Sequence, residues 1–200
     1  SATDEPLGQP APHRRWFEEL APTDAGLDYV HQENEYNDFD REKLLPHQLS
    51  TQGPALAVTE RNGSPLIYLG GSFGQNGQLY EVGDGQFRPV SPEATLEGSR
   101  YEDADAAFFD ANGDGREDLV VVSGGGEVGA GERVAPRLYL QDQGGRFQPF
   151  SEAFPDAVAT NAGCVVAFDF ERDGDQDLFI GGRSLPGSYG LPGRSYVLLN

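Results

Sequence analysis

The chain contains very little cysteine, lysine or tryptophan, and it has no methionine. Cys164 is the only cysteine among 200 residues, so no disulfide can form within the chain. It lies in the apolar run Gly163–Val166, which favours a small buried side chain over a nucleophile. A protein without disulfides can use a bound metal ion as its cross-link instead.

Basic residues are also scarce. The chain has 14 Lys and Arg against 33 Asp and Glu, which gives a net charge of −19, and Lys43 is the only lysine. Such a surface repels the phosphates of nucleic acids and of anionic lipids. No apolar run approaches the length of a transmembrane helix. We therefore expect no nucleic-acid partner and no membrane insertion.

The common short motifs of enzymes are missing as well. The chain has no Gly-x-Ser-x-Gly elbow, Walker loop or His-Glu-x-x-His motif. The glycine-rich runs 70–74 and 124–126 follow strand-like segments, but no helix pattern comes next, so a hairpin explains them better than a phosphate cradle. His31 precedes Glu33 and Glu35, which leaves a second metal or acid–base site open beside a solvated loop histidine. We expect no catalytic residue in this chain.

A ten-residue acidic loop occurs twice in the same register, at Asp110–Leu119 and Asp169–Leu178. Side-chain oxygens at positions 1, 3, 5 and 9, a glycine at position 6 and a backbone carbonyl at position 7 are what a hard cation such as calcium requires. The pattern predicts two Ca²⁺ sites. Their ligand positions are Asp110, Asn112, Asp114, Arg116 and Asp118 in the first loop, and Asp169, Glu171, Asp173, Asp175 and Asp177 in the second.

The two loops do not have the pattern of EF-hands. That motif needs a bidentate glutamate at position 12, where this chain has Val121 and Ile180. Each loop is flanked by short apolar, β-branched or aromatic runs, which are typical of buried strands. Each loop is therefore predicted to join two strands.

The loops belong to a longer repeat of about sixty residues. Each unit reads as four short strands joined by glycine-rich turns, which is typical of a β-propeller blade. We predict an all-β fold of four-stranded antiparallel sheets, forming a partial propeller of about three blades. The positions that align are Leu66, Leu119 and Leu178 in one strand, and Tyr80, Tyr139 and Tyr196 in the next.

The repeat divides the chain into five segments. Residues 51–97 are predicted to form a blade without a metal loop, since Thr59–Pro65 is two residues shorter than the acidic loops and lacks their carboxylates. Residues 98–157 form a blade with a calcium loop, and residues 158–200 an incomplete blade with the second loop. Residues 1–13 are expected to be a disordered lead-in, and 14–50 an N-terminal segment whose part from Trp16 to Ala21 is a candidate ring-closing outer strand.

These features together resemble the FG-GAP/VCBS-repeat proteins. The resemblance rests on the paired loops, the blade period and the segments Gly26–Asn34 and Leu44–Val58, and it covers residues 14 to 200. Within the group, the chain is most similar to bacterial members related to cartilage acidic protein, which often carry an ASPIC/UnbV domain. The resemblance implies an integrin-like propeller, usually seven-bladed, on an exported protein. Two features depart from the family pattern. The first unit lacks a metal loop, and Glu171 replaces the usual Asp or Asn at position 3, so ligation through water and no ligation by this residue both stay open.

The expected function is that of a calcium-binding propeller segment of an extracellular, periplasmic or cell-surface protein, acting in binding, adhesion or scaffolding. The start at Ser1 fits removal of a leader peptide and equally fits an arbitrary boundary. Recognition is expected in the loops 71–77, 124–132 and 185–193, with carbohydrate and protein ligands both open. Three partial blades cannot close a ring, which favours a piece of a longer protein over self-association. The alternatives are a non-catalytic part of a polysaccharide-processing enzyme and a self-assembling structural subunit.

Overall fold

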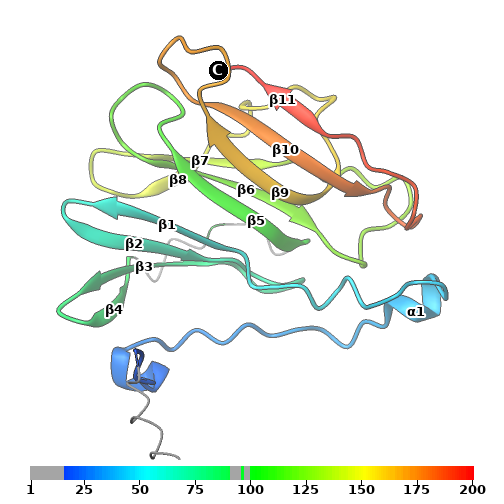
Figure 1. The fold of residues 1–200 in the computed structure, drawn as a ribbon, viewed down its shortest axis with the longest axis horizontal. Coiled ribbons are helices and arrows are strands. Elements are labelled where there is room, and N and C mark those ends of the chain that lie inside the picture. Colours follow the sequence, from blue (N-terminus) through cyan, green and yellow to red (C-terminus); the bar gives the residue numbers. More distant parts are fainter. Residues whose placement is uncertain (1–15, 91–95, 97–99) are drawn as a thin grey trace, which may run out of the picture.

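A computed structural model of the chain describes residues 16–90, 96 and 100–200, so the predicted lead-in at 1–13 lies outside the described residues. The described part contains eleven strands in three antiparallel sheets, while its only helical segments are the 3-10 turn Pro22–Ala25 and the one-turn α1, Asp38–Arg41. Figure 1 shows the three sheets stacked one above the next. This arrangement confirms the predicted all-β, partial-propeller fold. Neither helical segment is long or apolar enough to cross a membrane.

The first sheet has the order β1-β2-β3-β4 and lies within the predicted first blade. Its first hairpin pairs Arg61 with Ser64, so only Asn62 and Gly63 form the turn. Both turn residues have positive φ, 52° and 81°, which suits the right-handed twist of the two strands. This turn leaves no room for a ten-residue loop. The strands are β1 (Leu56–Arg61), β2 (Ser64–Leu69), β3 (Gln78–Gly83) and β4 (Gln86–Pro89).

The second sheet, β5-β6-β7-β8, is the middle layer of the stack. Every residue of β6 is buried, because both faces of this strand are covered by a neighbouring sheet. Leu119 and Val121 pack toward the first sheet, whereas Val120 and Val122 pack toward the third. The strands are β5 (Glu102–Phe109), β6 (Asp118–Gly124), β7 (Arg137–Gln141) and β8 (Phe147–Pro149).

The third sheet has the order β11-β10-β9 and contains three described strands. Its strands are β9 (Asn161–Phe168), β10 (Asp177–Ser184) and β11 (Tyr196–Leu198). Leu178 and Ile180 of β10 face the core, but Cys164 on β9 is only half-buried rather than fully buried as expected. The side chain of Cys164 rests against Gly181, where an added Cβ would lie 2.5 Å from its sulfur.

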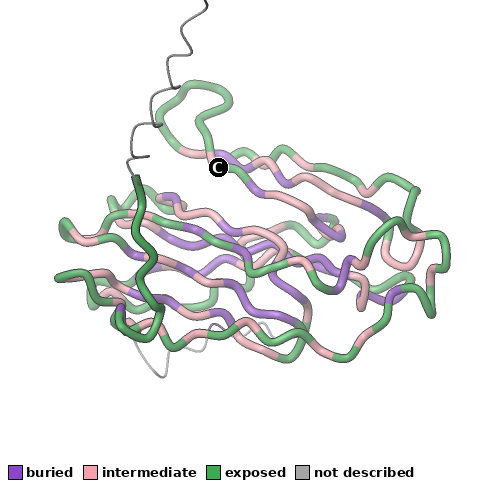
Figure 2. The backbone as a smooth tube through the Cα atoms, turned by 60° about the horizontal axis from the view of Figure 1, so that its bottom comes forward, coloured by how far each residue is buried: buried purple, intermediate pink, exposed green. Residues whose placement is uncertain are grey.

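Two hydrophobic cores fill the two spaces between the sheets, and Figure 2 shows buried residues concentrated in the strands of the stack. Full burial of one large aliphatic side chain contributes about 1.5–3 kcal/mol, so these layers supply most of the stability. The first core contains Ala57, Leu66, Tyr68, Leu79, Leu96, Ala106, Leu119, Val121, Tyr139 and Phe147. The second contains Phe109, Val120, Val122, Leu138, Val158, Ala162, Val165, Leu178 and Ile180.

A buried ion pair of the second sheet is hydrogen-bonded to the first sheet and to the loop that follows β2. Asp103 on β5 accepts hydrogen bonds from the Tyr68 hydroxyl at 2.6 Å and from the Gly71 amide at 2.8 Å. Its second oxygen pairs with Arg137 on β7. Because every oxygen of this buried carboxylate has a donor, its desolvation is compensated, and the network fixes the two sheets relative to each other.

Residues 26–50, which we call the strap, run below the first sheet to α1 and then turn back toward β1 (Figure 1). The Gln32 amide donates to the Gln75 side chain at 2.9 Å, and Arg41 donates to the Val128 carbonyl at 3.2 Å. Glu42 accepts from the Tyr189 amide at 2.7 Å. The strap therefore contacts each of the three loops that the sequence marked for recognition, and it occupies part of that rim.

The segment from Trp16 to Ala21 lies outside the described strands. Its apolar side chains are largely exposed, with Trp16 at 82% and Phe17 at 92%. The ring-closing role expected for this segment stays a prediction.

Candidate metal centres

The two acidic loops occupy the same place in consecutive sheets. Residues 110–117 join β5 to β6, and residues 169–176 join β9 to β10. Both strand pairs are antiparallel and pair up to the ends of the loop, with Phe109 opposite Asp118 and Phe168 opposite Asp177. The prediction that each loop joins two strands is confirmed.

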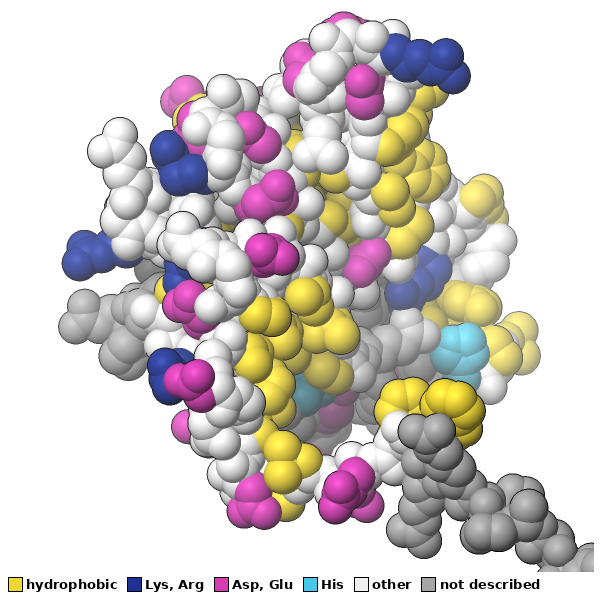
Figure 3. Space-filling model, turned by 60° about the vertical axis from the view of Figure 1, so that its left-hand side comes forward, with side chains coloured by type: hydrophobic (Ala, Val, Ile, Leu, Met, Phe, Trp, Pro, Cys, Tyr) yellow, Lys and Arg dark blue, Asp and Glu magenta, His cyan; other side chains and the backbone are white. Residues whose placement is uncertain are grey.

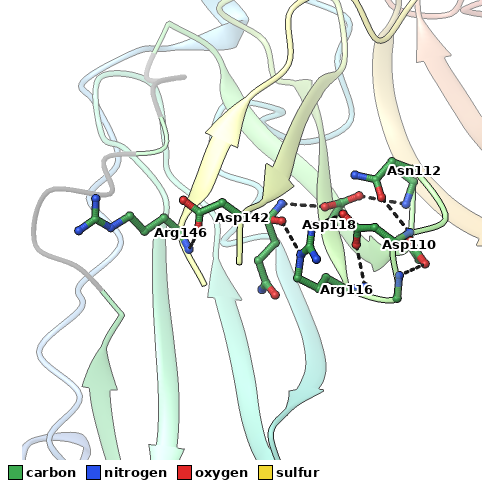
Figure 4. Close-up of polar contacts among 10 residues, drawn as sticks. Asp110, Asn112, Arg116, Asp118, Asp142 and Arg146 are labelled. Carbon is green, nitrogen blue, oxygen red and sulfur yellow. Dashed lines mark hydrogen bonds and ion pairs between the residues drawn. The ribbon is translucent and has the colours of Figure 1, made fainter. Parts of the chain in front are cut away.

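In the first loop, side-chain oxygens curl inward onto backbone amides (Figure 4). The amide of Asp114 donates to both Asp110 Oδ1, at 3.1 Å, and Asn112 Oδ1, at 3.0 Å. The amide of Gly115 donates to Asp110 Oδ2 at 2.7 Å. The oxygens of positions 1 and 3 therefore converge on one point of the loop.

The second loop repeats these contacts. The amides of Asp173 and Gly174 donate to Asp169 at 3.2 Å each, as the amides at positions 5 and 6 do in the first loop. Arg172 also donates its amide to Asp169, at 2.5 Å. The shared pattern shows that the repeat in the sequence is a repeat in local structure.

Positions 4 and 6 of both loops adopt left-handed backbone. Glycine fills position 6 twice, as Gly115 and Gly174, with φ of 80° and 106°. Position 4 has Gly113 in the first loop, but Arg172 in the second, with φ of 64°. The sequence pattern predicted a glycine at position 6 only, so the left-handed backbone at position 4 was not predicted.

Position 9 differs from the other ligand positions because it is buried. Asp118 is 0% exposed and Asp177 is 1% exposed. Asp118 accepts from the amides of Ala111, at 3.0 Å, and Gln141, at 2.7 Å. Asp177 accepts from Phe170 at 2.7 Å and from Asn200 at 3.0 Å. Each of these aspartates thus closes its own loop and holds the third strand of its sheet.

Burial raises the pKa of Asp118 above its ordinary value, although the two amides that it accepts from oppose this shift. The charges of Asp114 and Asp110 raise the pKa further. A cation held by the loop would relieve this repulsion.

The two loops balance their charge differently. In the first, the Arg116 guanidinium pairs with Asp114 and donates through Nε to the Gln141 carbonyl at 2.9 Å (Figure 4). In the second, position 7 is Asp175, which shares a hydrogen bond with Asp173. That bond lowers the pKa of Asp173 and raises the pKa of Asp175. The second loop therefore carries the larger unbalanced negative charge.

The donor atoms in both loops suit calcium, because they are carboxylate, amide and carbonyl oxygens. The residues at positions 1, 3 and 5 are brought together at the loop surface, whereas position 9 is turned onto backbone amides. In the second loop Glu171 lies at the surface, and partial desolvation together with a hydrogen bond to Asp173 raises its pKa.

A more closely spaced group of potential metal ligands lies outside the two acidic loops. His31, Glu33 and Glu102 each place one ligand atom within 4.8 Å of the other two. Among the described residues this is the only group of three or more His, Cys, Asp or Glu that gathers so closely. The sequence predicted a possible site at His31, Glu33 and Glu35. Glu102 could not be predicted, because β5 lies beside the strap only in the folded chain.

Comparison with known families agrees with the repeat. Residues 110–180 match the family model of the FG-GAP-like repeat. The match begins at position 1 of the first loop and ends within β10, so it spans both loops and omits the first sheet and the strap. Such repeats build propeller-like modules that often occur in adhesion and binding proteins and are typically non-catalytic. No curated protein matches the chain.

Proposed function

We propose that this chain is a calcium-stabilised, non-catalytic propeller segment of an exported protein, and that it serves as a binding or scaffolding surface. The observation that carries the proposal is the duplicated loop, which repeats its acidic pattern, the amide hydrogen bonds to its first aspartate and its position between the first two strands of a sheet. Two independent occurrences of such a pattern argue against a chance acidic turn.

Calcium in these loops would act on structure rather than on a substrate. Asp110, Asn112 and Asp114 supply oxygens in the first loop, with the carbonyl of Arg116 and the buried Asp118 nearby. Their counterparts in the second loop are Asp169, Glu171, Asp173, Asp175 and Asp177. The ion would supply positive charge between carboxylates that otherwise repel, and so stabilise the hairpin between two blade strands.

The exported location and the relationship to ASPIC/UnbV-containing proteins are parts of the same proposal. The family match supports the repeat class, and the resemblance of residues 26–34 and 44–58 supports the narrower group. Ligand recognition is assigned to the exposed part of the rim beside the strap, where Phe73 is 41% exposed and Tyr189 is 39% exposed. The ligand is a carbohydrate or a protein surface.

Calorimetry with Ca²⁺ and Mg²⁺ tests the proposal. We expect two Ca²⁺ per chain, with Mg²⁺ bound at least about tenfold more weakly because its octahedral shell fits a flexible oxygen loop poorly. Asp114→Ala and Asp173→Ala should each remove one site. Asp156→Ala is the matched control, since Asp156 is fully exposed and pairs only with the exposed Arg133 among described residues.

Thermal unfolding in the same variants provides the second readout. An ion at a hundred times its Kd stabilises the folded chain by about 2.7 kcal/mol, so each single variant should gain less from added calcium than wild type. An unchanged Tm of wild type on chelation, or equal affinity for the two ions, contradicts the proposal.

A second candidate function is self-assembly through the open face of the third sheet. Val166, Phe168 and Val197 on this sheet are 51%, 37% and 48% exposed. Figure 3 shows hydrophobic side chains gathered in strips on the molecular surface, between scattered acidic groups. A second copy of this chain is the proposed occupant of that face.

A further inference from the structure

We infer that His31, Glu33 and Glu102 form a binding site for one divalent transition-metal ion of the zinc type, separate from the two acidic loops. The three side chains come from the strap and from the first residue of β5. An ion bound there would link the strap to the middle sheet.

The distances within the cluster match metal ligation. His31 Nε2 lies 3.0 Å from Glu33 Oε1, and one oxygen of Glu102 is within 4.8 Å of both ligand atoms. Two ligands of a tetrahedral ion lie about 3.4 Å apart when each metal–ligand bond is about 2.1 Å long. The three atoms therefore need only small rotations of their side chains to share one ion.

Of the three side chains, Glu102 is the one whose burial most requires a compensating interaction. Its side chain is buried, with 2% of the residue exposed, and neither carboxylate oxygen accepts a hydrogen bond of ordinary geometry from a described residue, the backbone amide of Gln52 being a weak donor only. A buried carboxylate without donors costs several kcal/mol relative to one in water. The structure aims this group at His31 and Glu33, which are the two side chains able to share a cation with it.

The charges around Glu102 are mostly negative. Burial raises the pKa of Glu102 to about 9, and the charges of Glu33 and Glu127 add to the shift. Arg183 and the Gln52 amide oppose it, but they do not outweigh the other effects. Glu102 is therefore neutral at neutral pH when no metal is bound, and a divalent ion would displace its proton and stabilise the carboxylate.

The backbone keeps open the space between His31 and Glu102. A Cβ added at Gly53 would lie 2.7 Å from His31 Nε2 and 3.4 Å from Glu102 Oε1. Gly53 therefore borders both ligand atoms, and any larger residue there would press on them. The site also has a route to solvent, because the side chain of Glu33 is 30% exposed.

His31 is held in place from both sides. Tyr29 donates to the Gly70 carbonyl at 2.7 Å, and the Gln32 amide donates to the Gln75 side chain at 2.9 Å. These contacts fix the backbone of residues 29–32 on the loop after β2, so the imidazole is positioned before any ion arrives. Such preorganisation lowers the cost of assembling a metal site.

The donor types distinguish this site from the calcium loops. Imidazole nitrogen suits Zn²⁺ and similar transition metals, whereas Ca²⁺ takes oxygen ligands. The two kinds of site are also far apart. Glu102 opens β5 and Asp110 follows its end, so about 26 Å of extended chain separates them.

The test is a titration of the full chain with Zn²⁺ in the presence of millimolar Ca²⁺, followed by calorimetry. We expect one Zn²⁺ per chain beyond the calcium sites. His31→Gln and Glu102→Gln should each weaken Zn²⁺ binding at least about tenfold, while calcium binding stays unchanged. His47→Gln is the matched control, because His47 is also on the strap but is exposed and outside the cluster.

A fourth variant separates loss of the site from loss of the fold. Gly53→Ala keeps all three ligands and should weaken Zn²⁺ binding by filling the space beside them. Glu102→Gln replaces a carboxyl that is neutral without metal by a neutral group of the same shape, so its far-UV circular dichroism and metal-free Tm should match those of wild type. Zn²⁺ binding that survives in His31→Gln and Glu102→Gln, or that falls equally in His47→Gln, overturns the inference. Loss of calcium binding in Asp114→Ala with intact Zn²⁺ binding supports it independently of the proposed function.

Discussion

At the scale of single residues, the ligand positions of each acidic loop separate into two kinds. Asp114 is partly exposed, and its oxygens contact the amide and the guanidinium of Arg116. Asp118 is buried and accepts two backbone amides from different parts of the sheet. The first kind serves mainly the ion, while the second also supports the fold when no ion is bound.

This difference predicts unequal losses of stability when calcium is removed. In EGTA, Asp118→Ala should lower the free energy of unfolding by about 2–4 kcal/mol, because two buried amides lose their acceptor. Asp114→Ala should cost below about 1 kcal/mol under the same conditions, as for other exposed ion pairs. Urea denaturation followed by circular dichroism measures both, with Asp156→Ala as the reference. Equal losses in the two loop variants would contradict the division.

At the scale of elements, β6 is the strand with both faces covered. Leu119 is 0% exposed in the first core, whereas Leu199, just beyond β11, is 57% exposed. Burial on both faces explains why the apolar run Leu119–Val122 does not alternate with polar residues.

We therefore expect Leu119→Ala to destabilise the chain by about 2–5 kcal/mol, since it leaves a cavity between two sheets. Leu199→Ala, the same change at an exposed position, should shift the free energy of unfolding by no more than about 0.5 kcal/mol. Urea denaturation in saturating calcium measures both values. A small effect of Leu119→Ala would mean that the sheets do not pack as described.

The sequence predicted the sheets well because their signals are local. The apolar runs around each acidic loop and the Asn62–Gly63 turn depend on neighbours in the chain. The strap could not be predicted this way. Its charged sequence has no period, and its contacts are scattered hydrogen bonds to residues 40 to 147 positions away. Glu102 was missed for the same reason, since its partners at 31 and 33 lie on the strap.

At the scale of the whole molecule, the stack has a covered middle sheet and an outer sheet with exposed apolar side chains. Val166 on β9 is 51% exposed, and Phe168 on the same strand is 37% exposed. Apolar groups gathered on a strand surface favour association with another surface of the same kind.

Sedimentation velocity over a range of concentrations tests this association. Wild type should shift toward larger species as concentration rises, and Val166→Asp should raise the concentration needed by at least about tenfold, or about 1.4 kcal/mol. Leu44→Asp is the control, since Leu44 is 97% exposed but lies on the strap. A wild type that stays monomeric throughout, or an equal effect of Leu44→Asp, would contradict the second candidate function.

The path of the strap has a consequence for the order of folding. Its contacts reach the first, second and third sheets in turn, and the last of them joins Glu42 to Tyr189, 147 residues later. A chain that emerges from the ribosome or a translocation pore with its N-terminus first presents the strap long before its last binding partner exists. The strap therefore cannot complete its contacts until the sheets have formed. The contact between Glu42 and Tyr189 is the last, and it requires the third sheet.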